Sequence, residues 1–219
     1  MKKTLFIITC AFLSHYNLNA QVPVDSAFYA NNIRLTCLHP GNSLVDAYYG
    51  FPNMFALIFK TVFINGQSKD ISATSVGPMG GKYEYLLTDE IGLGAEFNYS
   101  SFALIFSRSG VNSYNKPVIY HDVYTSPAYR VLLGVNYHFI NSNNLDIYIA
   151  GKIGYYHRDI IVTSDDPKFI PVSVNIPSNP VAVRMELGLR YFPISFLGVH
   201  ANFGFFGGPL VAGGVSVKF

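Results

Sequence analysis

Serine, histidine and aspartate come close together in one part of this sequence. His121 and Asp122 are adjacent, with Ser113 and Ser126 nearby, and these residue types together could activate a hydroxyl nucleophile. The sequence has no Gly-x-Ser-x-Gly motif, and surface loops often collect such residues without any catalytic role. We therefore expect that the chain is not an enzyme, and we keep a lipid-modifying activity that depends on His121 as an alternative.

A second group of polar side chains lies in the stretch YYHRD, which contains His157, Arg158 and Asp159. If this stretch is a β-strand, successive side chains point to opposite faces. His157 and Asp159 then share one face and Arg158 points to the other, so the three do not form a compact acid–base site. We expect structural or interfacial roles for them.

Metal and cofactor chemistry has little support in the sequence. No pair of histidines is one helical turn apart, and no histidine joins neighbouring cysteines as in zinc sites. Asp165 and Asp166 in SDDPK could contact a divalent cation, but a hydrophilic turn is the favoured interpretation. Cys37 has no partner for an internal disulfide once the first 20 residues are removed. The histidines considered for a metal site, beyond the first 20 residues, are His39, His121, His138, His157 and His200. We expect no metal and no cofactor.

The elements that would position these side chains are predicted by the stretch NPVAVRMELGLRYF, residues 179–192. Apolar side chains alternate there with a set that includes Arg184, Glu186 and Arg190, which is the pattern of a strand with one apolar face. Seven more stretches alternate in this way, so we predict an all-β fold of about eight antiparallel strands without a helical domain. The eight stretches are 43–51, 81–87, 91–99, 129–139, 145–158, 179–192, 196–205 and 210–219.

The polar faces of these strands share twelve charged side chains of both signs. In a soluble sandwich or lipocalin they would face water. In a transmembrane barrel they would instead line the lumen as a network of ion pairs, with the apolar faces in contact with lipid. The twelve residues are Asp46, Lys82, Glu84, Glu96, Arg130, Asp146, Lys152, Arg158, Arg184, Glu186, Arg190 and Lys218.

Three features favour the transmembrane barrel. Only 13% of the residues are charged, against about 25% in soluble domains. No apolar run is long enough for a membrane-spanning helix, and a spanning protein without such helices must be a closed barrel. Short turns alternate with longer connections, as they do between the two sides of outer-membrane barrels. The longer, outer connections are expected at 52–74, 109–125 and 163–180.

The N-terminal residues are typical of an exported protein. Lys2 and Lys3 precede an apolar stretch, and Asn19 and Ala20 offer a small-residue cleavage site before Gln21. Residues 1–20 are therefore predicted to be a cleaved signal peptide. Residues 21–42 have no clear placement, and residues 43–219 form the predicted barrel domain. Without the two lysines the chain has 13 basic and 13 acidic residues, and this balance does not suggest a nucleic-acid partner.

With its signal peptide, alternating strands and terminal VSVKF, the chain resembles the small outer-membrane β-barrel proteins of Gram-negative envelopes, of the OmpX and OmpA-barrel type. The resemblance covers residues 43–219. It implies outer-membrane lipid as a partner, and it implies that the barrel-assembly machinery reads the terminal residues Val215, Val217 and Phe219.

The expected function is that of a porin-like outer-membrane protein with a narrow or salt-bridge-plugged lumen, in a structural or small-solute role. The alternative is a binding or adhesion module whose outer loops contact an unknown ligand. The apolar segment 52–63 is either an amphipathic helix at the membrane interface, with Asn53 as a cap, or a strand extension or collapsed loop.

Overall fold

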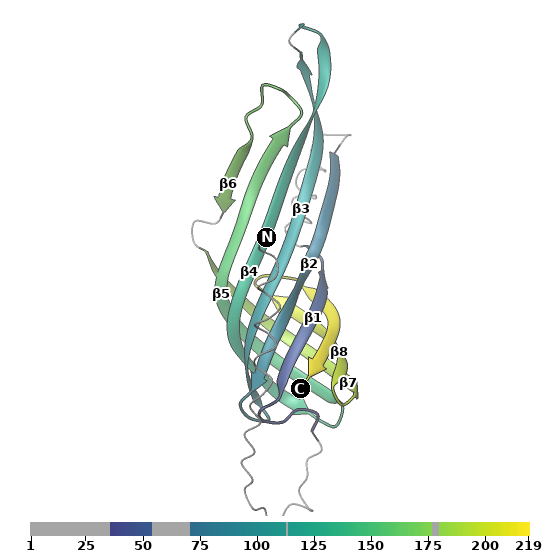
Figure 1. Ribbon diagram of the computed structural model, residues 1–219, viewed down its shortest axis with the longest axis vertical. Helices are drawn as coiled ribbons and strands as arrows, with labels where there is room; N and C mark the ends of the chain where they lie inside the picture. Colours follow the sequence, from purple (N-terminus) through teal and green to yellow (C-terminus); the bar gives the residue numbers. More distant parts are fainter. Residues whose placement is uncertain (1–35, 54–70, 113, 177–179) are drawn as a thin grey trace, which may run out of the picture. The chain divides into compact units, whose positions relative to one another are not determined.

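The computed structural model describes residues 36–53, 71–112, 114–176 and 180–219. The described residues form an antiparallel β-sheet (Figure 1). No helix among them is long and apolar enough to cross a membrane. The strands are β1 (Ser43–Phe51), β2 (Ile71–Leu86), β3 (Ile91–Val111), β4 (Pro117–Asn141), β5 (Leu145–Ser164), β6 (Val172–Ile176), β7 (Val181–Ile194), β8 (Leu197–Phe205) and β9 (Val211–Lys218).

Eight of these strands close into a ring. Each of β1 to β4 pairs with the next strand, β4 pairs with β5, β5 with β7, β7 with β8, β8 with β9, and β9 returns to β1. Among the described strands, the ninth, β6, pairs with β5 from Arg158 to Val162, the part of β5 that follows its pairing with β7. The prediction of an all-β antiparallel barrel of about eight strands is therefore confirmed.

The strands differ greatly in length. β1, β8 and β9 have 9, 9 and 8 residues, whereas β3, β4 and β5 have 21, 25 and 20. The long strands continue past one end of the ring, which we call the hairpin end, as a sheet that we call the outer sheet (Figure 1). The opposite end, with the tight β2–β3, β4–β5 and β7–β8 connections, is called the turn end.

The expected loop at 109–125 is wrong, because β3 and β4 stay paired up to Val111 and Pro117. Backbone hydrogen bonds between these strands replace the irregular segment that the sequence suggested. Within the expected loop 163–180, residues 172–176 form β6. In the expected loop 52–74, residues 71–74 belong to β2, and residues 54–70 lie outside the described part of the chain. Residues 1–35 lie outside it as well.

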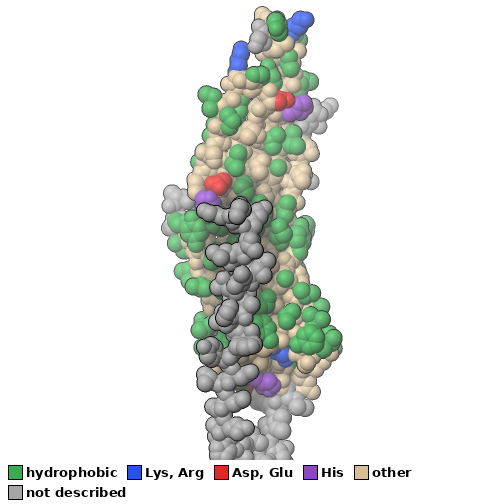
Figure 2. All heavy atoms as spheres, in the orientation of Figure 1, with side chains coloured by type: hydrophobic (Ala, Val, Ile, Leu, Met, Phe, Trp, Pro, Cys, Tyr) green, Lys and Arg blue, Asp and Glu red, His purple; other side chains and the backbone are tan. Residues whose placement is uncertain are grey.

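Burial is inverted relative to a soluble protein, as β7 illustrates. Its side chains alternate strictly between exposed and buried from Val181 to Phe192. Arg184 and Arg190 are only 1% exposed, whereas Leu187 is 49% exposed. On the face drawn in Figure 2, apolar side chains are spread over the barrel wall and charged ones are few. The apolar faces of the strands thus point out of the ring, and the charged faces point into it.

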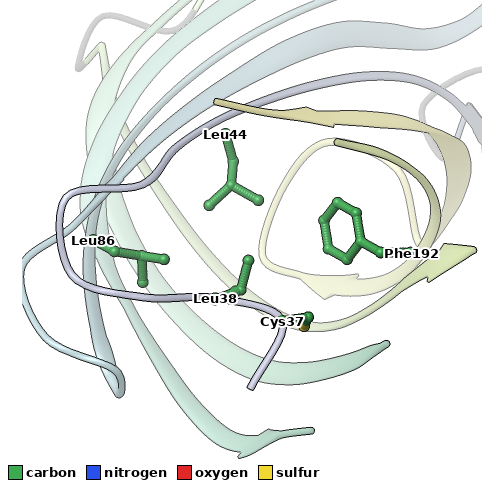
Figure 3. Packing of buried hydrophobic residues seen from close by; sticks show 5 residues of the cluster. All are labelled: Cys37, Leu38, Leu44, Leu86 and Phe192. Atoms are coloured by element: carbon green, nitrogen blue, oxygen red, sulfur yellow. The ribbon is translucent and has the colours of Figure 1, made fainter. Parts of the chain in front are cut away.

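The chain segment before β1 closes the turn end. The backbone N–H of Cys37 donates to the carbonyl of Ser142 at 2.8 Å, and the Asn141 side chain pairs with the backbone N–H and carbonyl of Leu38 at 3.1 and 2.8 Å. Leu38 is fully buried in an apolar cluster that we call the plug (Figure 3). The plug consists of Cys37, Leu38, Leu44, Leu86 and Phe192. Residues 36–42 are therefore part of the barrel structure.

Candidate functional site: the charged lumen

The twelve charged residues of the predicted lumen network lie on seven of the eight ring strands and point inward. Ten of them are buried, and Arg130 and Lys218 are partly exposed. The strict alternation of the strands produces this arrangement, because a residue two positions along a strand returns to the same face. The buried ten are Asp46, Lys82, Glu84, Glu96, Asp146, Lys152, Arg158, Arg184, Glu186 and Arg190.

Next to the plug, one arginine contacts three acids. Arg190 on β7 donates to Asp46 on β1 at 2.9 Å, to Glu84 on β2 at 2.7 Å and to Asp146 on β5 at 3.1 Å. His138 on β4 lies between two of the same acids, 2.6 Å from Asp146 and 2.8 Å from Glu84. This group, the acidic cluster, cross-links five strands around the ring.

The middle of the lumen holds a second network, in which bases outnumber acids. Lys152 lies 2.7 Å from Glu96, and Lys82 lies 2.5 Å from Glu186. Arg184 binds Glu186 at 3.1 Å and approaches Glu96 at 3.6 Å. Three bases therefore surround two carboxylates, and we call this group the middle cluster.

Two tyrosines add hydroxyl donors to the middle cluster. The Tyr48 hydroxyl donates to Glu96 at 2.6 Å, and the Tyr148 hydroxyl donates to Glu186 at 3.2 Å. Gly188 makes room for the second ring, since a Cβ at this position would lie 2.2 Å from the Tyr148 ring. Every carboxylate of the cluster thus receives both ionic and neutral donors, which a buried charge needs to offset its desolvation.

At the hairpin end, the lumen contains two arginines on β4 and β5. Arg130 donates to the Asn98 side chain at 3.2 Å, and its guanidinium lies over the Tyr156 ring at 4.3 Å. Arg158 lies 5.8 Å from the centre of the same ring, and it donates to the Ser126 hydroxyl at 2.9 Å and to the Tyr156 hydroxyl. Among the residues that the structure describes, acids outnumber bases next to the plug and arginines are more frequent towards this end. Lys218, the last of the twelve, donates to the carbonyl of Cys37 in the plug.

Several lumen residues were missed by the sequence reasoning, which looked for charges. Tyr48, Tyr148 and Asn98 occupy the polar faces that the alternation defines, and each binds a charged partner. His138 was weighed as a metal ligand and expected instead to have a structural or interfacial role, but it was not assigned to the network. Their positions in the sequence could have identified them as lumen residues. Each lies an even number of residues from a charged residue on the same strand, and such side chains share one face of the strand.

Among the described residues, the candidate catalytic side chains of His121, Asp122 and Ser126 are not assembled into one site. His121 is exposed and contacts Asp165, with its backbone N–H 2.8 Å and its ring 3.2 Å from the carboxylate. Its neighbour Asp122 points to the other face of the sheet and binds Arg108 at 2.9 Å. Ser126 is buried against Arg158. Ser113 lies outside the described residues.

The stretch 157–159 behaves as a strand. His157 and Asp159 share the outward face, with Nε2 of the histidine 3.1 Å from the carboxylate, and Arg158 points inward. The three side chains are therefore separated by the sheet, as the alternation predicts.

The paired aspartates at 165 and 166 bind protein groups of the outer sheet. Asp165 contacts His121, and Asp166 accepts from Arg108 at 3.2 Å and from the backbone N–H of Lys168 at 3.0 Å. The hydrogen bond from Lys168 and the Arg108 guanidinium lower the pKa of Asp166. Both carboxylates take part in local turn and sheet contacts, as expected of a hydrophilic turn.

Other predicted residues lie as follows. Val215, Val217 and Phe219 point outward and are 50%, 37% and 69% exposed. Asn53 donates to the carbonyls of Val76 and Ser101, and residues 54–63 of the apolar segment are outside the described chain. Among the described residues, no group of three or more histidine, cysteine, aspartate or glutamate side chains is arranged to hold a metal ion.

Comparison with known proteins finds likenesses among solved structures. A designed transmembrane β-barrel is similar, with 12% identity, a TM-score of 0.47, and coverage of 83% of this chain and 98% of the design. Ail, the attachment invasion locus protein of Yersinia pestis, is 15% identical with a TM-score of 0.45, covering 82% of this chain and 99% of Ail. The N-terminal β-barrel domain of Pseudomonas aeruginosa OprF is 14% identical with a TM-score of 0.42, covering 83% and 100%.

No protein-family model matches the sequence, and no curated protein matches it. The class of protein is defined by the described residues themselves. It is a closed eight-stranded antiparallel β-barrel with a charged interior and an apolar exterior.

Proposed function

We propose that this chain is an integral outer-membrane β-barrel protein in which the lumen is closed by ion pairs and by the plug, and that it acts as a porin-like structural element of the envelope. The observation that carries the proposal is the inverted burial. Exposed aliphatic side chains around the whole ring need a partner other than water, and closed barrels are the form in which β-strands cross a bilayer.

The dimensions of the apolar exterior suit a bilayer. The outward row of β7 from Val181 to Tyr191 rises by roughly 26 Å, if about 3.4 Å per residue and a tilt of about 40° are taken. This is close to the apolar band of about 25 Å of outer-membrane barrels. Exposed aromatic side chains lie at both limits of the band, as in interfacial girdles. They are Tyr83, Tyr85, Tyr137, Phe139 and Tyr191 at the turn end, and Tyr49, Phe51, Tyr129, Tyr155 and Phe205 at the hairpin end.

The filled lumen favours a structural role over an open channel. An eight-stranded barrel has an interior just wide enough for its own side chains, and here the acidic cluster, the middle cluster and the plug occupy successive levels. In planar bilayers we expect the protein to show no steady conductance. A stable open channel in the wild-type protein would contradict the closed lumen, although it would leave the membrane location intact.

The membrane location has its own test. We expect expressed protein to fractionate with the outer membrane and to migrate faster on a detergent gel before boiling than after, because the folded barrel resists the detergent. A sample unfolded in urea before loading is the matched control. Recovery of a freely soluble periplasmic protein whose migration does not depend on boiling would overturn the proposal.

Export and assembly complete the proposed role. Cleavage near Ala20 would release the mature chain, and the outward residues Val215, Val217 and Phe219 would engage the assembly machinery. Replacing Phe219 with Ser should reduce the folded fraction in cells while purified protein still refolds in detergent, if its role is in recognition. Equal loss in cells and in detergent would indicate a role in stability alone.

Binding through the outer sheet is a second candidate function. It is favoured by the pairing of β3 with β4, which continues from Tyr99–Tyr129, level with the end of β1, to Val111–Pro117, since binding residues often lie on surface segments that a rigid scaffold positions. Replacing residues 105–123 with an Asn-Gly turn removes the tip at the Leu104–Tyr124 pair. Loss of cell or matrix binding, with the gel shift retained, would support this function.

A further inference from the structure

A small polar group interrupts the apolar outer face of the barrel near its hairpin end. It consists of Tyr129 on β4, of Tyr155, His157 and Asp159 on β5, and of Asn175 on β6, and we call it the outer-face site. We propose that this site binds the ammonium group of a lipid headgroup in the outer leaflet. The inference rests on the membrane location proposed above and adds one specific lipid contact to it.

The first support is the charge of Asp159. The acids of the lumen network point inward, whereas Asp159 points outward with 35% of its side chain exposed. Its hydrogen-bond partner is His157, whose Nε2 lies 3.1 Å from the carboxylate. No lysine or arginine points outward from the described parts of β4, β5 and β6. A negative charge in these surroundings favours a cationic ligand.

The second support is the hydrogen bonding of His157, which leaves its ring neutral. The amide nitrogen of Asn175 donates to Nδ1 at 3.0 Å, so Nδ1 accepts and carries no proton. The proton on Nε2 is donated to Asp159. A neutral imidazole does not cancel the charge of the carboxylate, and it does not repel a cation.

The third support is a platform of three rings beside the carboxylate. The ring centroids of Tyr129 and His157 are 4.9 Å apart, and the rings of Tyr155 and His157 are stacked with centroids 6.4 Å apart. Tyr129 and Tyr155 are 38% and 43% exposed. Faces of tyrosine rings attract ammonium groups. The site therefore offers a negative charge and exposed ring faces within one small area.

The height of the site on the barrel wall matches the lipid headgroups. Tyr155 pairs with Val181, at the limit of the apolar band. With about 3.4 Å per residue and a tilt of about 40°, His157 and Asp159 lie roughly 5 and 10 Å above Tyr155. The headgroup layer is roughly 5 to 8 Å thick on each side of the hydrocarbon. Because the Asp159 carboxylate contacts His157, it lies within reach of this layer, and we assign a lipid as the source of the ammonium group.

The first test compares two lipids on the wild-type chain. The whole refolded chain in dodecyl maltoside is titrated with dihexanoyl phosphatidylethanolamine or with its N-acetyl derivative, which lacks the ammonium group. Native mass spectrometry measures the bound lipid. We expect one ethanolamine lipid per chain, bound at least about fivefold more tightly than the acetylated one, because the acetyl group removes both the charge and the attraction to the rings. Equal affinities would overturn the proposal.

The second test uses a matched pair of acids. Asp165 also contacts a histidine, His121 at 3.2 Å, and its side chain is 52% exposed, but it lies beyond the end of β5 on the outer sheet. Asp159→Asn should weaken binding of the ethanolamine lipid about fivefold or more, and Asp165→Asn should change it by less than about twofold. Equal affinities in the two variants would overturn the proposal.

Tyr155→Leu tests the platform, because it keeps an apolar side chain and removes the ring. We expect binding of the ethanolamine lipid to weaken about twofold to fivefold. An unchanged affinity would contradict the site. The comparison of the two lipids needs no variant, so it applies even where a variant fails to fold.

Competition distinguishes a lipid from a soluble amine. Glycerophosphoethanolamine has the same headgroup without acyl chains, and at equal concentration it should leave the lipid bound. Complete displacement would contradict a lipid ligand. The gel shift and flotation with vesicles report separately on the proposed membrane location. A chain that fails both would overturn the proposed function, whereas a folded, vesicle-bound chain with equal affinity for the two lipids would overturn the site alone.

Discussion

Arg190 in the lumen and Arg108 in the outer sheet make similar contacts in opposite surroundings. Arg190 binds three carboxylates at 2.7 to 3.1 Å with 1% of its side chain exposed. Arg108 binds Asp122 at 2.9 Å and Asp166 at 3.2 Å with 43% of its own side chain exposed, while the two carboxylates are 7% and 15% exposed. An ion pair that water can reach contributes less than a fully buried one, down to about 0 to 1 kcal/mol when both partners are solvated.

Inside the ring, separated partners have no such alternative. Removing one member of a buried pair leaves an uncompensated charge and costs about 3 to 5 kcal/mol. The comparison teaches that the distance between two charges says little about their importance until the surroundings are known. The same sheet, β3 to β5, carries both kinds of contact along its length.

The largest expected effect comes from Arg190→Leu. It leaves the acidic cluster with three carboxylates and His138, and we expect a loss of at least about 3 to 5 kcal/mol in the free energy of unfolding, or failure to fold. Urea unfolding in detergent measures it. The matched variant Arg108→Leu should cost less, because water reaches the guanidinium of Arg108, and equal losses in the two variants would break the comparison.

Leu38→Ala tests the plug. Truncation of a fully buried leucine should cost about 2 to 5 kcal/mol. Cys37 reports on the same cluster, because burial raises the pKa of its thiol to about 11, and a neutral thiol reacts slowly. In a chain without residues 1–20, a maleimide at pH 7.5 should modify Cys37 slowly in the folded wild type, faster in Leu38→Ala and fully after boiling. Rapid labelling of the folded wild type would contradict the closed turn end.

Leu187→Arg sharpens the comparison from the outer face. The Leu187 side chain lies midway along β7 and is 49% exposed. In a bilayer this arginine should cost about 2 to 4 kcal/mol, measured by urea unfolding in lipid vesicles. The control Ser107→Arg, on the exposed outer sheet, should cost less than about 0.5 kcal/mol. A neutral Leu187→Arg would mean that water, not lipid, contacts this face.

The smallest expected effect is the pH dependence of the outer sheet. The Ser164 hydroxyl and the Arg108 guanidinium lower the pKa of Asp122. A carboxyl with a lowered pKa stabilises the folded state above its unfolded pKa, and this contribution disappears as the pH falls through the folded value. The protection factors of the amides near Asp122, which compare the exchange rate with the intrinsic rate at the same pH, should therefore fall below about pH 4, and Arg108→Leu should weaken this dependence. Protection factors that do not change with acid would contradict the lowered pKa.

The sequence predicted the ring better than its extension. The observed β1 has the predicted bounds 43–51, and the inward row of β7, with Arg184 and Arg190, is the predicted one. These strands have one apolar and one polar face, so apolar and polar residues alternate along the sequence and the strand can be recognised from it. Between Phe102 and Phe106 both faces of β3 are apolar, and on β4 the polar residues between Pro117 and Pro127 resemble a loop. Only pairing between the two strands defines that region.

The candidate site follows the same division. Which side chains point into the lumen could be predicted from alternation, but not which acid contacts which base. Arg190 is separated from Asp46 by 144 positions in the sequence, and the contact results from ring closure and strand register. Leu38 was also beyond prediction, because its segment has no periodicity and is placed by hydrogen bonds to Asn141.

The pairing of β1 with β9 along eight residue positions has a kinetic consequence. The seam joins strands that are made early and late, so loop-closure entropy opposes it until the whole sheet exists. Before that moment Asp46 and Arg190 cannot meet, and an open sheet exposes its ionised face. Insertion of this protein should therefore be slow and highly cooperative, with closure of the seam as the final step.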